Sequence, residues 1–166
     1  MDLERVLGID PGLQTTGYGI LSRYGEGTTV IEAGVIRTSS ATPMAKRLLI
    51  LHKEISHLIR EYKPRVVVLE ELYTHLRHPR TGILMAQARG VICLAAAQAG
   101  LRLVGYPNKR VKKAIVGNGS ASKSQVQSAI QARLSLRNLP PSEDVADALA
   151  LALAHMEMDG CVRTTS

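Results

Sequence analysis

Four carboxylates stand at the ends of apolar segments, where a charge is costly. Asp10 and Glu70 each end a short apolar run, and Asp144 and Asp147 open an otherwise apolar stretch that continues to Ala154. Removing a carboxylate from water without a partner costs several kcal/mol. Mg²⁺ and Mn²⁺ prefer hard oxygen ligands gathered from separate elements, so a bound divalent cation would offset this cost. These four acids are therefore the candidate metal ligands and catalytic residues.

The spacing of the last two acids fits metal-assisted hydrolysis. Asp144 and Asp147 are three residues apart, which places them one turn apart on the same face of a helix. With two further acids at strand ends, they suit a pair of divalent ions about 4 Å apart. Such a pair activates a water and stabilises the leaving oxygen of a phosphodiester without a covalent nucleophile.

Each acid also has a structural interpretation. Asp144 falls in the first turn of a helix, where the helix dipole favours anions. Asp10 begins Asp-Pro-Gly, which is common in turns. Asp147 lies beyond the first helical turn, so its polar partner must come from elsewhere in the fold. Glu70 and Glu71 are adjacent and point to opposite faces of a strand, so only one of them should face the metals.

Positive charge is concentrated in one part of the chain. The 166 residues have a formal net charge of +7, yet residues 72–142 contain no Asp or Glu and eleven Lys or Arg. A basic surface beside an acidic pocket is typical of nucleic-acid binding, although a merely solvated basic face is the alternative. The candidate DNA-binding cations are Arg77, Arg80, Lys109, Arg110, Lys112, Lys113 and Lys123.

The order of predicted elements indicates an α/β fold. The predicted strands are residues 6–10, 17–22, 29–37, 66–70 and 103–106. The predicted helices are residues 44–62, 81–99, 107–116, 122–134 and a last one that begins near 142. Short turns between the first three strands imply an antiparallel meander, and the later β-α-β unit implies parallel strands.

This order is that of the ribonuclease-H-like architecture, a mixed five-stranded sheet with helices on both faces. Its first and fourth strands lie side by side, so Asp10 and Glu70 should face a common site. We assign residues 1–158 to one nuclease domain and 159–166 to a short disordered tail. The charged start and the lack of a long apolar run predict a cytoplasmic protein that does not bind membranes.

A set of short motifs occurs in a fixed order from about residue 6 to 155. They are Gly8-Ile9-Asp10-Pro11-Gly12, Thr16-Gly17-Tyr18-Gly19, Leu69-Glu70-Glu71, Gln87-Ala88-Arg89-Gly90-Val91, Val111-Lys112, Gly117-Asn118-Gly119-Ser120-Ala121 with Lys123, and Asp144-Val145-Ala146-Asp147-Ala148-Leu149-Ala150. Each motif alone is weak. The ordered set resembles the RuvC family of bacterial Holliday-junction resolvases.

The resemblance implies an endonuclease that nicks two strands of a four-way DNA junction symmetrically, in homologous recombination and DNA repair. It implies two Mg²⁺ ions per active site, for which Mn²⁺ would substitute, a homodimer, and a branch-migration motor as a further partner. The four acids named above match the family's catalytic residues. Lys112 and Lys123 match its basic residues, and Tyr73 takes the place of an aromatic near the crossover. Glu71 is a departure that adds charge near the site.

Residues 81–99 independently favour a dimer, because this helix has little polar surface. One side must be covered by the sheet and another by something else, for which a symmetry mate is the economical answer. Deep burial within a monomer is the alternative.

Three other functions compete with junction resolution. The glycine-rich residues 8–19 resemble the first phosphate loop of sugar-kinase or actin-like proteins, but those proteins need a second domain. A non-catalytic DNA-binding module explains the basic residues and leaves the four acids unexplained. An RNA–DNA hybrid nuclease shares the metal site, and substrate choice would distinguish it.

Overall fold

The computed structural model describes residues 4–25, 27–71 and 79–163, and their side chains up to residue 159. Its strands are β1 (Glu4–Asp10), β2 (Thr15–Tyr24), β3 (Gly27–Arg37), β4 (Val66–Glu70) and β5 (Arg102–Tyr106). Its helices are α1 (Met44–Tyr62), α2 (Pro79–Gln98), α3 (Asn108–Val116), α4 (Lys123–Arg133) and α5 (Glu143–Arg163).

The five strands form one mixed sheet in the order β3-β2-β1-β4-β5. The pairs β1–β2 and β2–β3 are antiparallel, whereas β1–β4 and β4–β5 are parallel. The predicted meander, the parallel β-α-β unit and the neighbouring first and fourth strands are therefore confirmed. The hairpin of β2 and β3 is longer than predicted, because Gly25 has φ +62° and the two strands stay paired up to the turn there.

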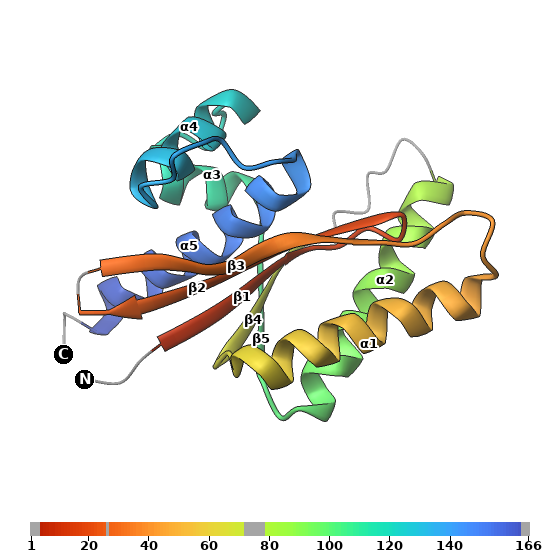
Figure 1. Ribbon diagram of the computed structural model, residues 1–166. Helices are drawn as coiled ribbons and strands as arrows, with labels where there is room; N and C mark the ends of the chain where they lie inside the picture. Colours follow the sequence, from red (N-terminus) through yellow and green to blue (C-terminus); the bar gives the residue numbers. More distant parts are fainter. Residues whose placement is uncertain (1–3, 26, 72–78, 164–166) are drawn as a thin grey trace.

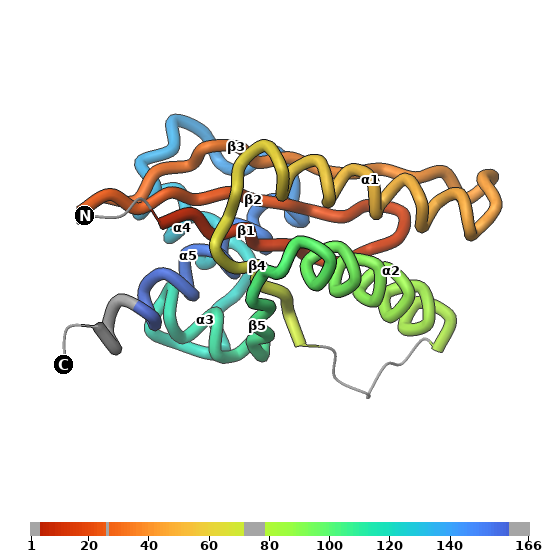
Figure 2. The backbone as a smooth tube through the Cα atoms, turned by 90° about the horizontal axis from the view of Figure 1, so that it is seen from below, coloured from red at the N-terminus to blue at the C-terminus, as the bar shows by residue number. Residues whose placement is uncertain are grey.

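Helices cover both faces of the sheet, as predicted, and each face has its own apolar core (Figure 1). Alternation along the strands decides which side chain enters which core. In β4, Val66 and Val68 pack with α3, α4 and α5, whereas Val67 and Leu69 pack with α1 and α2. Figure 2, which is viewed from below, shows α1 and α2 running side by side on one face of the sheet.

Helix α5 lies unusually close to β1 and β2 because glycines face it. A Cβ atom added to Gly8 would stand 2.1 Å from the carbonyl oxygen of Ala148. One added to Gly17 would stand 2.0 Å from the carbonyl oxygen of Asp144. No side chain fits between the helix and these strand positions, so the glycines set the height of α5 above the sheet.

Recognisable local features mark three of the helix ends. Ser122 caps α4 in a capping box with Gln125, and Lys63 ends α1 in the left-handed conformation. Helix α2 begins at Pro79, two residues before the predicted start, because proline is tolerated in a first turn.

The last helix differs from the prediction at its carboxyl end. Helix α5 runs to Arg163 and therefore includes most of the segment 159–166 that was predicted to be a disordered tail. An ion pair between Arg102 and Asp159, at 3.7 Å, attaches this last part of the helix to β5. Among the described residues, no helix combines the length and apolar character needed to cross a membrane.

The glycine contact generates a stability prediction. Gly17→Ala should lower the free energy of unfolding by about 3 kcal/mol, because the new methyl group meets backbone that has no room to move. The matched control is Gly27→Ala, since a Cβ there is no closer than 3.7 Å to another atom. Urea unfolding of both variants measures the difference. Equal stability of the two variants would show that α5 does not depend on the gap at Gly17.

Candidate metal centre

Two of the four acids come from the ends of neighbouring parallel strands. Asp10 is the last residue of β1 and Glu70 the last residue of β4, and the pairing of Ile9 with Leu69 places the two acids at the same level. Gly8 and Val68, two residues earlier, face α5. Because side chains alternate, Asp10 and Glu70 also project toward α5.

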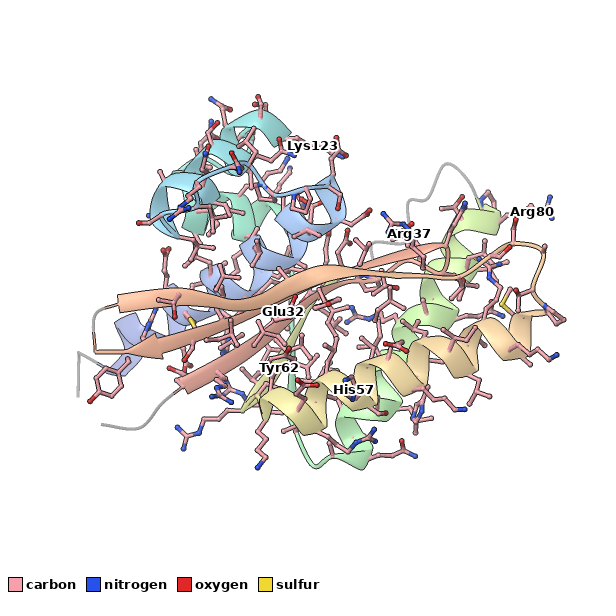
Figure 3. All side chains as sticks on the ribbon, viewed as in Figure 1. Glu32, Arg37, His57, Tyr62, Arg80 and Lys123 are labelled. Atoms are coloured by element: carbon pink, nitrogen blue, oxygen red, sulfur yellow. The ribbon has the colours of Figure 1, made fainter. Side chains whose placement is uncertain are left out.

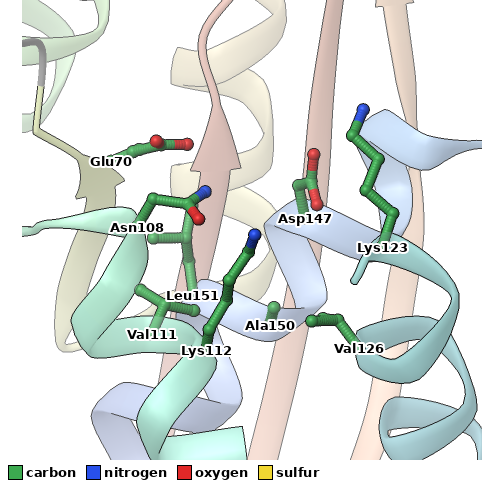
Figure 4. Close-up of a pocket in the computed structure, with 9 residues that line it drawn as sticks. All are labelled: Glu70, Asn108, Val111, Lys112, Lys123, Val126, Asp147, Ala150 and Leu151. Carbon is green, nitrogen blue, oxygen red and sulfur yellow. The ribbon is translucent and has the colours of Figure 1, made fainter. Parts of the chain in front are cut away.

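Helix α5 supplies the other two acids. Asp144 lies against Gly17, which is the β2 partner of Asp10, so the close approach of α5 carries Asp144 to the end of β1. Asp147 is one turn further along and lines a pocket that Glu70 enters from the opposite side (Figure 4). The structure thus brings together all four acids that the sequence analysis selected.

The electrostatics of this cluster oppose full ionisation. Burial raises the pKa of Asp10 to about 7, and the negative charges of the other three acids add to the increase. Burial also raises the pKa values of Glu70 and Asp147, and nearby carboxylates add to both shifts. At neutral pH Asp10 is therefore only partly ionised, and a bound cation would favour the ionised form of these acids.

Two lysines partly supply that positive charge. Lys112 of α3 and Lys123 of α4 line the same pocket (Figure 4), and their charges lower the pKa of Asp147. Lys123 also forms a 2.5 Å ion pair with Glu143, the exposed first residue of α5. The lysines therefore stand where they can contact a phosphate that approaches the acids.

The donor set fits a hard divalent cation. Four carboxylates from three elements converge here, which is the ligand chemistry that Mg²⁺ and Mn²⁺ prefer. Within the described part of the chain, no three Asp, Glu, His or Cys side chains are close enough together to enclose one ion.

Glu71 lies on the other face of the strand end. Its side chain packs over Gly105 of β5, near the guanidinium group of Arg89 from α2. Arg89 also donates a hydrogen bond to the backbone carbonyl oxygen of Glu70. Of the two adjacent glutamates, Glu70 is therefore the one that faces the other acids, and Glu71 points toward the α2 layer.

The remaining predicted DNA-binding residues are placed as follows. Lys109, Arg110 and Lys113 are exposed on α3, and the Arg110 guanidinium lies 5.3 Å from the ring centre of Tyr106. Arg80 is exposed at the start of α2, away from Lys123 at the start of α4 (Figure 3). Tyr73 and Arg77 lie outside the described residues.

Sequence reasoning missed two residues at this site. Asn108, the first residue of α3, lines the pocket and its side chain hydrogen-bonds to Glu70. Glu143 holds Lys123 in the ion pair described above. A signal for Asn108 existed, because it follows β5 by two residues and β5 pairs with β4 at Glu70. Side chains just after adjacent parallel strands meet at the same sheet edge.

The sheet order and the acid cluster define the class as a ribonuclease-H-like nuclease fold. A solved structure of Thermus thermophilus RuvC in complex with a Holliday junction substrate superimposes with a TM-score of 0.91. It is 29% identical to this chain and covers 96% of each chain. The yeast mitochondrial Holliday junction resolvase Ydc2 shares the fold with a TM-score of 0.71, at 16% identity, over 97% of this chain and 81% of its own.

Sequence comparison gives the family. The model of the family described as crossover junction endodeoxyribonuclease RuvC matches residues 6–155. The crossover junction endodeoxyribonuclease RuvC of Rhodopirellula baltica is 47% identical over 148 residues, which are 89% of this chain and 83% of that protein. The chain belongs to the RuvC family.

The raised pKa of Asp10 predicts how pH changes stability without metal. Its pKa is 3.8 in an ordinary environment and about 7 here, so ionisation disfavours the folded state progressively from about pH 4 to pH 7. Asp10→Asn removes this effect and should raise the free energy of unfolding above pH 7 by on the order of 2 kcal/mol. Below about pH 4 the difference should vanish.

Urea unfolding in chelator at pH 4, 6 and 8 measures this effect. Glu71→Gln is the control, because Glu71 lies outside the cluster and its replacement should not change the pH profile. Added Mg²⁺ should stabilise the unmodified protein more than Asp10→Asn, since a ligand stabilises only the state that binds it. If Asp10→Asn were no more stable than the unmodified protein at pH 8, the acid cluster would not be electrostatically strained.

Proposed function

We propose that this chain is a structure-selective endonuclease that resolves Holliday junctions by paired, symmetric, Mg²⁺-dependent phosphodiester hydrolysis. One observation carries the proposal. The four acids converge at the carboxyl ends of β1 and β4 beneath α5, with lysines beside them, in a chain that belongs to the RuvC family. The similarity to a RuvC structure that holds a Holliday junction supports the substrate class.

The acids are proposed to act as metal ligands. Asp10, Glu70, Asp144 and Asp147 would hold two Mg²⁺ ions, which Mn²⁺ could replace. Bound there, the ions would supply charge stabilisation and a water of lowered pKa. The protein's own part is to hold the carboxylates from three elements and to present Lys112 and Lys123 to the scissile phosphate.

The basic surface is proposed to bind the junction. Lys109, Arg110 and Lys113 are exposed on the helix that also carries Lys112, so one helix can follow a phosphate backbone. We assign a supporting role to Arg77 and Arg80 as cations of the basic segment, and to Tyr73 from the family resemblance alone. Branch-migration machinery as a further partner also rests on the resemblance.

A homodimer is proposed on the exposed face of α2. Ile83 is 59% exposed and Leu94 51% exposed, and the exposed residues Gln87, Gly90 and Ala97 continue the same stripe. The stripe repeats every three or four residues, as one helix face does. Small residues within it allow a second helix to approach closely. An isologous pair would present two active sites to the two equivalent strands of a junction.

Choice of substrate tests the proposed function. Synthetic mobile four-way junctions should be cut in pairs only when Mg²⁺ or Mn²⁺ is present, whereas a linear duplex and an RNA–DNA hybrid should stay intact. Glu70→Gln should abolish cleavage and leave junction affinity near normal, because binding resides in the cations. Glu71→Gln is the matched control and should remain active. Hybrid cleavage without junction cleavage would instead indicate an RNA–DNA hybrid nuclease.

The dimer proposal predicts the effect of a charge on α2. Leu94→Glu should give a folded monomer of 18.0 kDa that has lost paired nicking, because the exposed stripe can no longer pack against its symmetry mate. Leu84 and Val91 are less suitable, since both pack partly against the core. Sedimentation at micromolar protein concentration measures the oligomeric state.

The matched control is Leu139→Glu, which replaces a leucine that is equally exposed at 50% but lies in the segment between α4 and α5. This variant should sediment as the unmodified protein does. A monomeric unmodified protein that still makes coordinated paired cuts would contradict the dimer.

A further inference from the structure

Glu70 is half-buried at the end of a strand, and its carboxylate must be placed accurately. It is the last residue of β4, so the sheet fixes its backbone but not the rotation of its side chain. Unlike Asp144 and Asp147, it has no helix to orient it. A carboxylate at a strand end has free rotamers, and holding it in one orientation requires a partner.

Two residues contact Glu70 from opposite faces of the sheet. From the α2 side, Arg89 donates a hydrogen bond to the Glu70 backbone carbonyl oxygen. From the pocket side, the Asn108 side chain hydrogen-bonds to the Glu70 carboxyl group, and both side chains enter the pocket (Figure 4). Arg89 therefore fixes the backbone of Glu70, and Asn108 contacts its functional group.

The fold brings Asn108 to this place by strand register. Glu70 pairs with Tyr106 of β5, and Asn108 follows Tyr106 by two residues. Pro107 between them is extended, with φ −61° and ψ 140°, and serves as the N-cap position of α3. Asn108 is thus the first helical residue above the strand end, where its side chain reaches across to the neighbouring strand.

The chemistry of an amide suits this position. A carboxylate accepts about four hydrogen bonds, so one N–H donated by Asn108 leaves the remaining lone pairs for a cation. A lysine or arginine in its place would add positive charge and compete with that cation. Lys112, one turn along α3, supplies charge to the pocket separately.

We propose that Asn108 is a positioning residue, which orients the Glu70 carboxylate toward the site shared with Asp10 and Asp147 and so raises affinity for divalent cations. The inference rests on the proposed function, in which Glu70 is a metal ligand. Asn108 also borders a hollow lined by Lys109, Lys112, Gly119 and Ser120. The competing role is therefore a direct contact from Asn108 to the DNA backbone.

Calorimetric titration of the DNA-free protein with Mn²⁺ tests the proposal. Asn108→Ala should bind Mn²⁺ at least about 10-fold more weakly, which is the lower end of the loss usual when a partner of a metal ligand is removed. Asn108→Gln, which keeps the amide, should recover part of the affinity. Asn138→Ala, which replaces an exposed asparagine between α4 and α5, is the matched control and should bind as the unmodified protein does.

A double-mutant cycle shows whether Asn108 acts through Glu70. In the Glu70→Gln background, adding Asn108→Ala should not weaken Mn²⁺ binding further. If the two residues contributed to Mn²⁺ affinity independently, their losses of binding free energy would add. Junction affinity of Asn108→Ala, measured in Ca²⁺, should stay unchanged. Unaltered Mn²⁺ affinity, additive losses or a selective loss of junction affinity would each overturn the proposal. An unmodified protein that fails to cut junctions would refute the proposed function, while the Mn²⁺ titration would still test Asn108.

Discussion

The contact between α5 and the glycines of β1 and β2 is the constraint on which the site depends. Gly8 and Gly17 let the helix backbone descend onto the strands until carbonyl oxygens occupy the positions that a methyl group would need. At that height Asp144 lies beside the β2 partner of Asp10, and Asp147 faces Glu70 across the pocket. A higher helix would separate the helical acids from the strand acids, because the sheet fixes only Asp10 and Glu70.

The same geometry creates the electrostatic strain of the site. Burial of the Asp10 carboxyl group, with a further contribution from the neighbouring carboxylates, raises its pKa to about 7. Lys112 and Lys123 relieve part of this repulsion without eliminating it. The ionised acids repel one another when no cation is bound. A bound divalent cation removes this repulsion, and this gives the site's affinity for metal a physical origin.

The sequence predicted the parts of the structure that follow from periodicity and strand order. The apolar run that ends at Glu70 predicted β4, and the helical spacing of residues 44–62 predicted α1, both with the bounds that the structure shows. Strand order then placed Asp10 beside Glu70. The motifs 8–12 and 16–19 were noticed as family features, but only the structure explains them, since Gly8 and Gly17 are needed where α5 touches the sheet. Glu143 was missed because its role depends on which side chains meet across elements, which one sequence does not encode directly. Asn108 was missed because its position two residues after β5 becomes informative only with the register of β5 against β4.

The central claim is that the four acids form one divalent-cation site. Anomalous diffraction from crystals soaked in Mn²⁺ tests it most directly. The account predicts Mn²⁺ peaks enclosed by Asp10, Glu70, Asp144 and Asp147, with the Glu70 carboxylate turned toward them and Glu71 uninvolved. Saturating Mn²⁺ that left this pocket empty, or that bound elsewhere on the protein without these acids, would contradict the account.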